Sequence, residues 1–191
     1  MKIAHVISSI DKYSGGTSVY MKLLLESLEG QVEQNLVTTI SENSLEINGS
    51  LNLICLRKNK MNNKFKFLQT DLFHGNGLWQ YPVHVMSKTA IKRKIPYIIS
   101  THGMLEPWAL NQGKLKKKLA FKLFQYKDLA EATCIHATAP MEVISIRALG
   151  FKNPVAMIPN GINISEFPVK LPVKIKVQYN FKSQIEEKTE N

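Results

Sequence analysis

Short apolar runs of strand length alternate along the chain with segments whose apolar residues recur at helical spacing. The runs that predict strands lie at residues 2–8, 34–40, 51–56, 72–74, 97–101, 134–138 and 155–158. Helices are predicted at residues 17–28, 81–94, 114–129 and 141–149. In the first helix, Val19, Leu23 and Leu24 form the predicted buried face. Because the strands are almost entirely apolar, the pattern predicts an α/β fold whose doubly wound parallel sheet carries helices on both faces.

The length of the chain and its change of character near Phe167 indicate one domain followed by a tail. A chain of 191 residues is long enough for one domain with a sizeable core. After residue 168, lysines alternate with apolar residues and the end is polar. The sequence therefore predicts a domain at residues 1–168 and a linker or tail at residues 169–191.

The N-terminus and the hydropathy pattern bear on where the protein resides. The apolar stretch after Met1 is only a few residues long and is interrupted by His5, which is typical of a first strand and not of a signal peptide. No run of about 18 apolar residues occurs, so no membrane-spanning helix is predicted. We therefore expect a cytoplasmic protein.

The formal net charge of +10 suggests a partner or a strongly solvated face. Six lysines fall on the predicted helix at residues 114–129, where Leu115, Leu119, Leu123 and Phe124 recur at helical spacing. A solvated face is the simplest interpretation, and peripheral contact with an anionic membrane, at its inner face, is the alternative. Nucleic acid is not an expected partner, because no recognised nucleic-acid-binding motif accompanies the lysines.

Ligands of open parallel sheets bind beyond the carboxyl ends of the strands, so residues directly after each strand are the candidates for a site. Gly15, Gly16 and Thr17 follow the first strand and open a helix. Paired glycines let a ligand approach the backbone, and amides at a helix start favour a phosphate. A purely structural turn, with Thr17 as the helix N-cap, is the competing interpretation.

Two further strands end in a histidine and a glycine. The first carries four crevice candidates, namely His74, Asn76, Gly77 and Trp79, and the next carries His102 and Gly103. Because two imidazoles leave neighbouring strands, we expect them to lie at one edge of the sheet. Such polar groups and rings suit a hydroxyl-rich ligand.

The remaining histidines and the common catalytic patterns point to no other chemistry. His5 and His136 lie inside strands and are predicted core residues, whereas His84 has no assigned role. The spacing of His74 and His102 matches no metal-binding pattern, so no metal is expected. The sequence contains no GxSxG motif, which argues against an α/β-hydrolase. It also contains no GxGxxG motif, which argues against a nicotinamide-dependent oxidoreductase.

Taken in order, these motifs resemble the N-terminal domain of a family 4 (group 1) glycosyltransferase of the GT-B architecture. The motifs that carry the resemblance lie at residues 2–6, 15–17, 71–79, 96–105, 136–142 and 158–163. The resemblance covers residues 1 to about 168 and implies a Rossmann-like domain that binds the acceptor.

What the resemblance implies about the site follows residue by residue. Gly15 and Gly16, with Thr17 and Gly103, would lie near the phosphate and sugar of the donor. His102 would contact the transferring sugar as the catalytic position, and Glu142 would join the crevice. Asn160 and Gly161 would form the turn that leads toward the interdomain linker.

The resemblance also implies a reaction and a second domain. Family members transfer a sugar from a nucleotide-sugar donor, such as a UDP- or GDP-sugar, with retention of configuration and without a metal or other cofactor. A glycan or lipid-linked acceptor and a place in polysaccharide biosynthesis are expected. The donor-binding domain would have to follow Asn191, so we expect a truncated or split enzyme that is inactive alone. The alternative function is a non-enzymatic saccharide-binding or membrane-surface module.

Overall fold

The computed structural model describes residues 1–39 and 43–162 of the chain. The strands in this part are β1 (Lys2–Ile7), β2 (Glu33–Thr39), β3 (Asn52–Leu56), β4 (Leu72–Asn76), β5 (Tyr97–Ser100), β6 (Cys134–Ala137) and β7 (Val155–Met157). The helices are α1 (Gly16–Ser27), α2 (Lys58–Phe67), α3 (Tyr81–Arg93), α4 (Pro107–Asn111), α5 (Lys114–Ala120), the π-helical η1 (Phe121–Gln125), α6 (Tyr126–Ala130) and α7 (Pro140–Ala148).

The described strands form one sheet in the order β3-β2-β1-β4-β5-β6-β7, and every neighbouring pair is parallel. The chain first moves outward from β1 to β3 and then returns to the other side of β1 with β4. This reversal places the topological switch point between β1 and β4. The predicted doubly wound α/β fold is confirmed.

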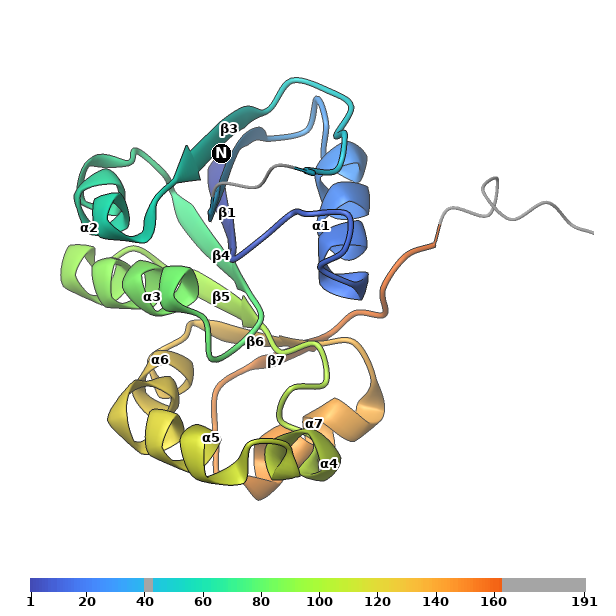
Figure 1. Cartoon of the computed structure of the whole chain (residues 1–191), viewed down its shortest axis with the longest axis vertical. Helices are drawn as coiled ribbons and strands as arrows, with labels where there is room; N and C mark the ends of the chain where they lie inside the picture. Colours follow the sequence, from blue (N-terminus) through green and yellow to red (C-terminus); the bar gives the residue numbers. More distant parts are fainter. Residues whose placement is uncertain (40–42, 163–191) are drawn as a thin grey trace, which may run out of the picture.

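Helices lie on both faces of the sheet, with α1 on one side and α2, α3 and the α5–α6 segment on the other (Figure 1). The larger core cluster lies on the side of α3 and is built from residues such as Phe65, Phe73, Met86 and Ile135. The smaller cluster lies beneath α1 and contains Ile7, Ile10, Met21, Leu25 and Leu36. Burial of these side chains on both faces is what makes the strands almost wholly apolar in sequence.

A row of hydrogen-bonded polar side chains crosses the sheet on the face of α1. His5 Nδ1 lies 3.1 Å from His74 Nδ1, and His74 Nε2 lies 2.8 Å from Ser100 Oγ. Ser100 Oγ lies 2.7 Å from His136 Nδ1, and His136 Nε2 lies 2.9 Å from the carbonyl oxygen of Ile158. The row therefore joins β1, β4, β5 and β6 to the residue that follows β7.

The carbonyl of Ile158 sets the direction of every hydrogen bond in this polar row. A carbonyl only accepts, so His136 Nε2–H must donate to it, which leaves His136 Nδ1 to accept from the Ser100 hydroxyl. Ser100 Oγ in turn accepts from His74 Nε2–H, and His74 Nδ1 accepts from His5 Nδ1–H. His5 Nε2 is then an acceptor that is buried without a partner among the described residues.

Burial favours the neutral form of two histidines in this row, His5 and His74. Burial lowers the pKa of His5 from its ordinary value of 6.5 to about 4. Burial, followed by the neighbouring histidines, also lowers the pKa of His74 well below its ordinary range. His5 and His136 are 2% and 6% exposed, so their predicted place in the core is confirmed.

Several local predictions differ from the structure. Helix α2 was not predicted, because only Met61 and Phe65 of its ten residues are buried and the rest of its sequence is polar. Val19 is 47% exposed, since α1 turns Ser18, Met21 and Leu25 toward the sheet instead. Strand β4 continues to Asn76, two residues beyond its predicted end.

The helix predicted at residues 114–129 is present as α5, η1 and α6 in succession, with a widened π-helical turn in the middle. Within the described residues, no helix is both long and apolar enough to cross a bilayer. The predicted linker or tail at residues 169–191 lies outside the described residues.

The buried histidines make the stability of the fold depend on pH. The folded chain keeps His5 neutral down to a pKa of about 4, whereas the unfolded chain takes up a proton near pH 6.5. The stabilisation is therefore complete above pH 6.5 and is lost as the pH falls toward 4. For His5 alone we expect the free energy of unfolding to fall by roughly 2 kcal/mol between pH 7.5 and pH 5.

Urea unfolding at the two pH values measures this loss. The His5→Gln variant keeps an amide donor toward His74 but cannot titrate, so its loss of stability over the same interval should be smaller. An equal loss in both proteins would contradict the assignment to His5.

Candidate functional site

The loops that follow β1, β4, β5 and β6 meet at one edge of the sheet. The strands are parallel and adjacent in the order β1-β4-β5-β6, so their carboxyl ends point the same way. Near the switch point, the loop after β1 leads to α1 on one face of the sheet and the loop after β4 leads to α3 on the other, and open sheets of this kind bind ligands at such a point. Candidate chemistry is therefore expected at this edge.

The glycine loop after β1 is open on the side that a ligand would approach. Gly15 is the N-cap of α1 with φ 82°, a left-handed conformation that favours glycine. A Cβ atom added to Gly15 or to Gly16 would meet nothing within 4 Å. Thr17 lies in the first turn of the helix, so the interpretation of Thr17 as the N-cap is wrong. Among the described residues, no side chain caps the amides at the start of α1.

His102 sits at the centre of the site and has a strained backbone. Its φ of 48° is left-handed, which is uncommon for a residue with a Cβ atom and is found most often at functional positions. Nε2 of His102 lies 3.3 Å from Oδ1 of Asn76, and the ring packs edge-on against Tyr20 with centroids 4.8 Å apart. Gly103, also left-handed at φ 72°, completes the turn.

The protonation state of His102 follows from its surroundings. Burial lowers the pKa of His102 to about 4, so the ring is neutral at pH 7. The Nδ2 amide of Asn76 donates to the carbonyl of His74 at 3.4 Å, which leaves Asn76 Oδ1 to accept from His102 Nε2–H. Nδ1 of His102 is then a lone-pair acceptor.

Glu142, near the start of α7, ties the loop after β5 to the loop after β6. Its carboxylate accepts hydrogen bonds from the hydroxyls of Thr101 and Thr138 and from the backbone N–H of Thr138 at 3.2 Å. Burial opposes ionisation, but the hydrogen bonds from Thr101, Thr138 and the backbone of Gly103 outweigh it and lower the pKa of Glu142. Glu142 is only 5% exposed, so its observed contacts hold the loops in place.

The residues predicted after β4 separate into two groups. His74 and Asn76 are buried, and Asn76 joins His102 directly. Trp79, whose φ of 63° is also left-handed, donates its backbone N–H to Gln125 Oε1 at 2.7 Å and places its ring near Phe121. The described contacts of Trp79 are therefore with η1.

The loop after β4 is connected to the loop after β1 through Gly77 and Gln80. Gln80 was not among the residues predicted from the sequence. A Cβ atom on Gly77 would lie 2.6 Å from Nε2 of Gln80, so glycine leaves room for that side chain. Oε1 of Gln80 in turn accepts from the backbone N–H of Ser8 at 3.1 Å. Gln80 thus fixes the loop after β4 against the loop after β1.

Sequence reasoning also missed Tyr20 and Ser100. Tyr20 lies one helical turn after the glycine loop and contacts both His102 and His136, while Ser100 is the hydroxyl at the centre of the polar row. Ser100 directly precedes Thr101 and His102, so its place in the motif was the available signal. No sequence signal identified Tyr20, because its partners are distant in sequence.

The segment after β7 passes beside α1. Asn160 and Gly161 are exposed, and Gly161 borders a hollow with Leu23 and Glu26 of α1. The predicted turn toward an interdomain linker is therefore at the surface, next to the helix that carries the glycine loop.

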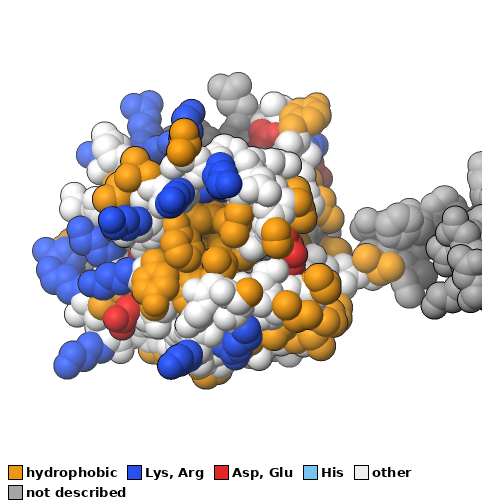
Figure 2. Space-filling model, turned by 90° about the horizontal axis from the view of Figure 1, so that it is seen from below, with side chains coloured by type: hydrophobic (Ala, Val, Ile, Leu, Met, Phe, Trp, Pro, Cys, Tyr) orange, Lys and Arg blue, Asp and Glu red, His pale blue; other side chains and the backbone are white. Residues whose placement is uncertain are grey.

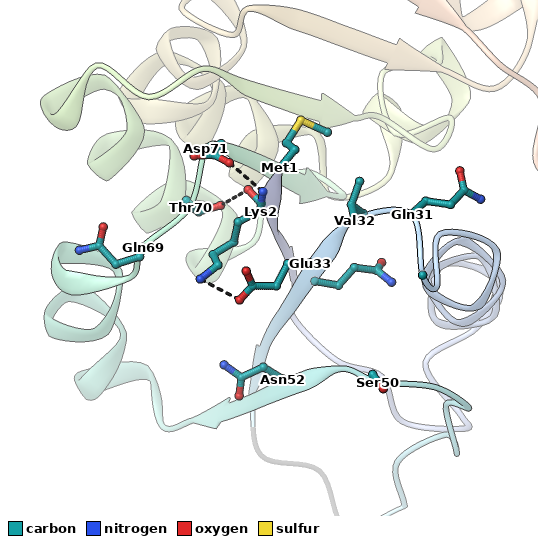
Figure 3. A pocket seen from close by; sticks show the side chains of 12 residues that line it. Met1, Lys2, Gln31, Val32, Glu33, Ser50, Asn52, Gln69, Thr70 and Asp71 are labelled. Carbon is teal, nitrogen blue, oxygen red and sulfur yellow. Dashed lines mark hydrogen bonds and ion pairs between the residues drawn. The ribbon is translucent and has the colours of Figure 1, made fainter.

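A hollow of about 710 Å³ lies at the opposite edge of the sheet, around the amino ends of β1 and β2 (Figure 3). Its charged groups already pair with one another: Lys2 Nζ lies 2.7 Å from Glu33 Oε1, and the backbone N–H of Lys2 donates to Asp71 at 2.7 Å. Because sheets of this type bind ligands at the carboxyl edge, we do not place the site here. Among the residues described, no cluster of three potential ligands could hold a metal ion.

Comparison with known proteins places the fold. The chain aligns with Staphylococcus aureus MnaA in a structure with UDP at a TM-score of 0.59 and 12% identity, covering 82% of this chain and 43% of that one. It aligns with Anabaena HepE in complex with UDP and glucose at a TM-score of 0.58 and 14% identity, covering 86% and 46%. The chain thus spans less than half the length of these structures. No curated protein matches.

The sequence matches a family model more directly. The model described as Glycosyltransferase Family 4 matches residues 14–166, which contain the glycine loop, the His102 turn and Glu142. This range includes strands β2 to β7 and the loops that follow β4, β5 and β6 at the carboxyl edge of the sheet. The chain belongs to glycosyltransferase family 4.

Proposed function

We propose that this chain forms the acceptor-side wall of a crevice in which a sugar passes from a nucleotide-sugar donor to a glycan or a lipid-linked acceptor, with retention of configuration. The observation that carries the proposal is that the open glycine loop after β1 and the neutral, strained His102 after β5 lie at the same carboxyl edge of the sheet, with Tyr20 of α1 packed on the His102 ring. Membership of glycosyltransferase family 4 supports it. The aligned S. aureus and Anabaena proteins were solved with UDP, in keeping with a nucleotide-sugar donor.

Gly15 and Gly16 would stabilise the diphosphate as the sugar leaves. The first amides of α1 carry the positive end of the helix dipole, and no described side chain caps them. Negative charge grows on the departing diphosphate during transfer, so amides held beside it would favour the transition state. The open space around both glycines would admit the phosphate oxygens.

His102 would orient the sugar. Its Nε2–H is engaged by Asn76, so the free Nδ1 lone pair would accept a hydrogen bond from a sugar hydroxyl. The contacts with Asn76 and Tyr20 hold the ring in one direction, which is how a side chain contributes to catalysis by orientation. A charged imidazolium would lose this acceptor.

A second domain would complete the crevice. The described residues contain one sheet, and the aligned structures are more than twice the length that the match covers. We therefore propose that the donor is gripped mainly by a second domain and that residues 1–191 supply the other wall.

The proposal predicts that the purified 191-residue chain folds but does not turn over nucleotide sugars. Incubation with UDP- and GDP-sugars and glycan acceptors should release no nucleotide above the rate without protein. Sugar transfer by the isolated chain would contradict the need for a second domain, while leaving the assignment of the site intact.

The glycine loop should bind diphosphate weakly by itself. We expect UDP and UDP-glucose, with Kd on the order of millimolar, to shift the amide resonances of Gly16 and Thr17. In Gly16→Ala the new Cβ atom would enter the open side of the loop, so the affinity for both ligands should fall about fivefold to tenfold. The helical backbone of Gly16 accepts alanine, and stability should not fall.

A matched control separates binding from backbone strain. Gly15→Ala and Gly30→Ala both place alanine at a positive φ with open space around it. Gly15, at φ 82° and ψ −163°, occupies a backbone region that is essentially restricted to glycine, so Gly15→Ala should cost roughly 1–3 kcal/mol of stability and Gly30→Ala about 1 kcal/mol. Of these two variants, Gly15→Ala should lower the affinity for UDP and Gly30→Ala should not. Equal ligand affinity in all three variants would contradict a phosphate site at the loop.

His102 should act on the sugar and not on the diphosphate. His102→Asn keeps a residue type that tolerates the left-handed backbone but removes the imidazole. The variant should bind UDP as the parent does and lose about fivefold in affinity for UDP-glucose. His84→Gln, which keeps a donor to Asp128 outside the crevice, should change neither affinity. An equal loss for UDP would place His102 on the diphosphate instead.

A further inference from the structure

Helix α5 and the η1 segment that continues it turn three leucines outward. Leu115, Leu119 and Leu123 are 84%, 60% and 70% exposed. They recur every fourth residue and therefore lie along one side of the helix. Large apolar residues at such spacing ordinarily face a core, so their exposure in a row requires an explanation.

The opposite side of the same helix fixes the leucines in this orientation. The ring of Phe121 packs near Trp79 and Phe151, with centroids 6.2 and 6.0 Å away. Phe124 packs on His84, and Gln125 accepts the backbone N–H of Trp79. A rotation of the helix that hid the leucines would expose these partners.

Positive charge surrounds the leucines. Six lysines lie in this stretch, namely Lys114, Lys116, Lys117, Lys118, Lys122 and Lys127. No acidic residue occurs in the sequence between Glu106 and Asp128. None of the six forms an ion pair with another residue of the described part of the chain. Lys117 Nζ donates to the carbonyl oxygen of Ala109 at 2.5 Å, and the charges of the other five are available to an external partner.

The side of this helical segment that carries Phe121, away from the leucines, borders an apolar hollow. A cavity of about 210 Å³ is lined by Trp79, Leu110, Phe121 and Leu149, and three of the six lysines surround it. Figure 2 shows hydrophobic side chains gathered in the middle of the face seen from below, with Lys and Arg side chains around them. Trp108 of the adjoining α4 is 64% exposed, and tryptophan is a residue typical of the membrane interface.

We propose that this leucine-lysine surface, formed by α5 and η1 with Leu115, Leu119 and Leu123 at its centre, docks on an anionic lipid bilayer. The leucines would enter the boundary between headgroups and acyl chains, and the lysines would contact the anionic headgroups. The inference goes beyond the proposed sugar transfer and does not depend on it.

Charge and residue type favour a bilayer over the other occupants of such a surface. A second copy of the chain would bring two unpaired lysine clusters together, which is repulsive. A nucleic acid would use the lysines but would gain nothing from a row of exposed leucines. A bilayer with anionic lipids satisfies both the charge and the apolar row.

The position of the surface relative to the crevice would suit a membrane-bound acceptor. Helices α4 and α5 follow directly after the turn that contains His102, so the docking surface and the crevice share one connection. A lipid-linked acceptor anchored in the same bilayer would then lie near the site without leaving the membrane.

Sedimentation of the full chain with lipid vesicles tests the proposal. We expect binding to vesicles of phosphatidylcholine and phosphatidylglycerol, weakening as salt is raised, and at least tenfold weaker binding to phosphatidylcholine alone. The emission of the exposed Trp108 should shift to shorter wavelength in the bound state. Equal binding to both kinds of vesicle, or none to either, would overturn the proposal.

The contribution of the leucines is tested by substitution with a matched control. The combined Leu115→Gln, Leu119→Gln and Leu123→Gln variant should bind anionic vesicles at least tenfold more weakly. The Met141→Gln and Ile144→Gln variant, which removes exposed apolar side chains from α7, should change binding less than twofold. Circular dichroism checks that both variants keep the helical signal, and undiminished binding by the leucine variant would overturn the proposal.

The contribution of the lysines is tested in the same way. Lys118→Gln with Lys122→Gln should weaken binding at least fivefold, whereas Lys60→Gln with Lys64→Gln removes the same charge from α2 and should have a much smaller effect. If the two variants lost vesicle affinity equally, the net charge of the chain would explain the binding, and the assignment to this surface would be overturned.

Two further outcomes would assign the surface to another occupant. A second copy of the chain would be indicated if light scattering showed a dimer, if the leucine substitutions converted the dimer to a monomer, and if the parent chain bound no vesicles. Binding of duplex DNA that survives the leucine substitutions, together with no vesicle binding, would indicate a nucleic acid. Either result would overturn the bilayer proposal.

Discussion

The structure depends on one buried row of hydrogen bonds that crosses its sheet. The carbonyl of Ile158 can only accept, and this single constraint fixes the tautomers of His136, His74 and His5 in turn. Burial lowers the pKa values of His5 and His74 and so favours the neutral imidazoles that this pattern uses at these two positions. The row joins β1, β4, β5 and β6 to the residue after β7. The loops at the carboxyl ends of these four strands therefore begin from fixed positions.

The site above this row combines fixed and open parts. Glu142 holds the turns after β5 and β6 through threonine hydroxyls, and Gln80 holds the loops after β1 and β4. Two of the described non-glycine residues with a positive φ, His102 and Trp79, lie in the loops after the neighbouring strands β5 and β4, and the third, Lys94, ends α3. The glycine loop and Gly103 are left open. This division suits a site in which a rigid imidazole faces a ligand that enters beside exposed amides.

The molecule has a second organised surface beside this crevice. The same helical segment supplies Gln125 to the loop after β4 and carries the outward leucines on its other side. The π-helical turn at η1 lies where these two requirements meet. A widened turn changes which residues face inward, and π-helical turns are frequent at functional sites. The packing of Phe121 thus connects the crevice to the leucine-lysine surface.

The sequence alone predicts the order of most strands and helices, because almost wholly apolar strands that alternate with helices are typical of a parallel sheet covered on both faces. It also determined that His102 and the glycine loop share an edge, since the carboxyl ends of parallel strands must meet there. Helix α2 escaped prediction because two buried residues give too weak a periodicity. Three features follow from the folded arrangement and not from any local pattern: His5 faces His74, 69 residues away, Tyr20 packs on His102, and the leucines of α5 and η1 point outward. These features depend on contacts between distant segments, and no local pattern specifies which side of a helix such contacts will cover.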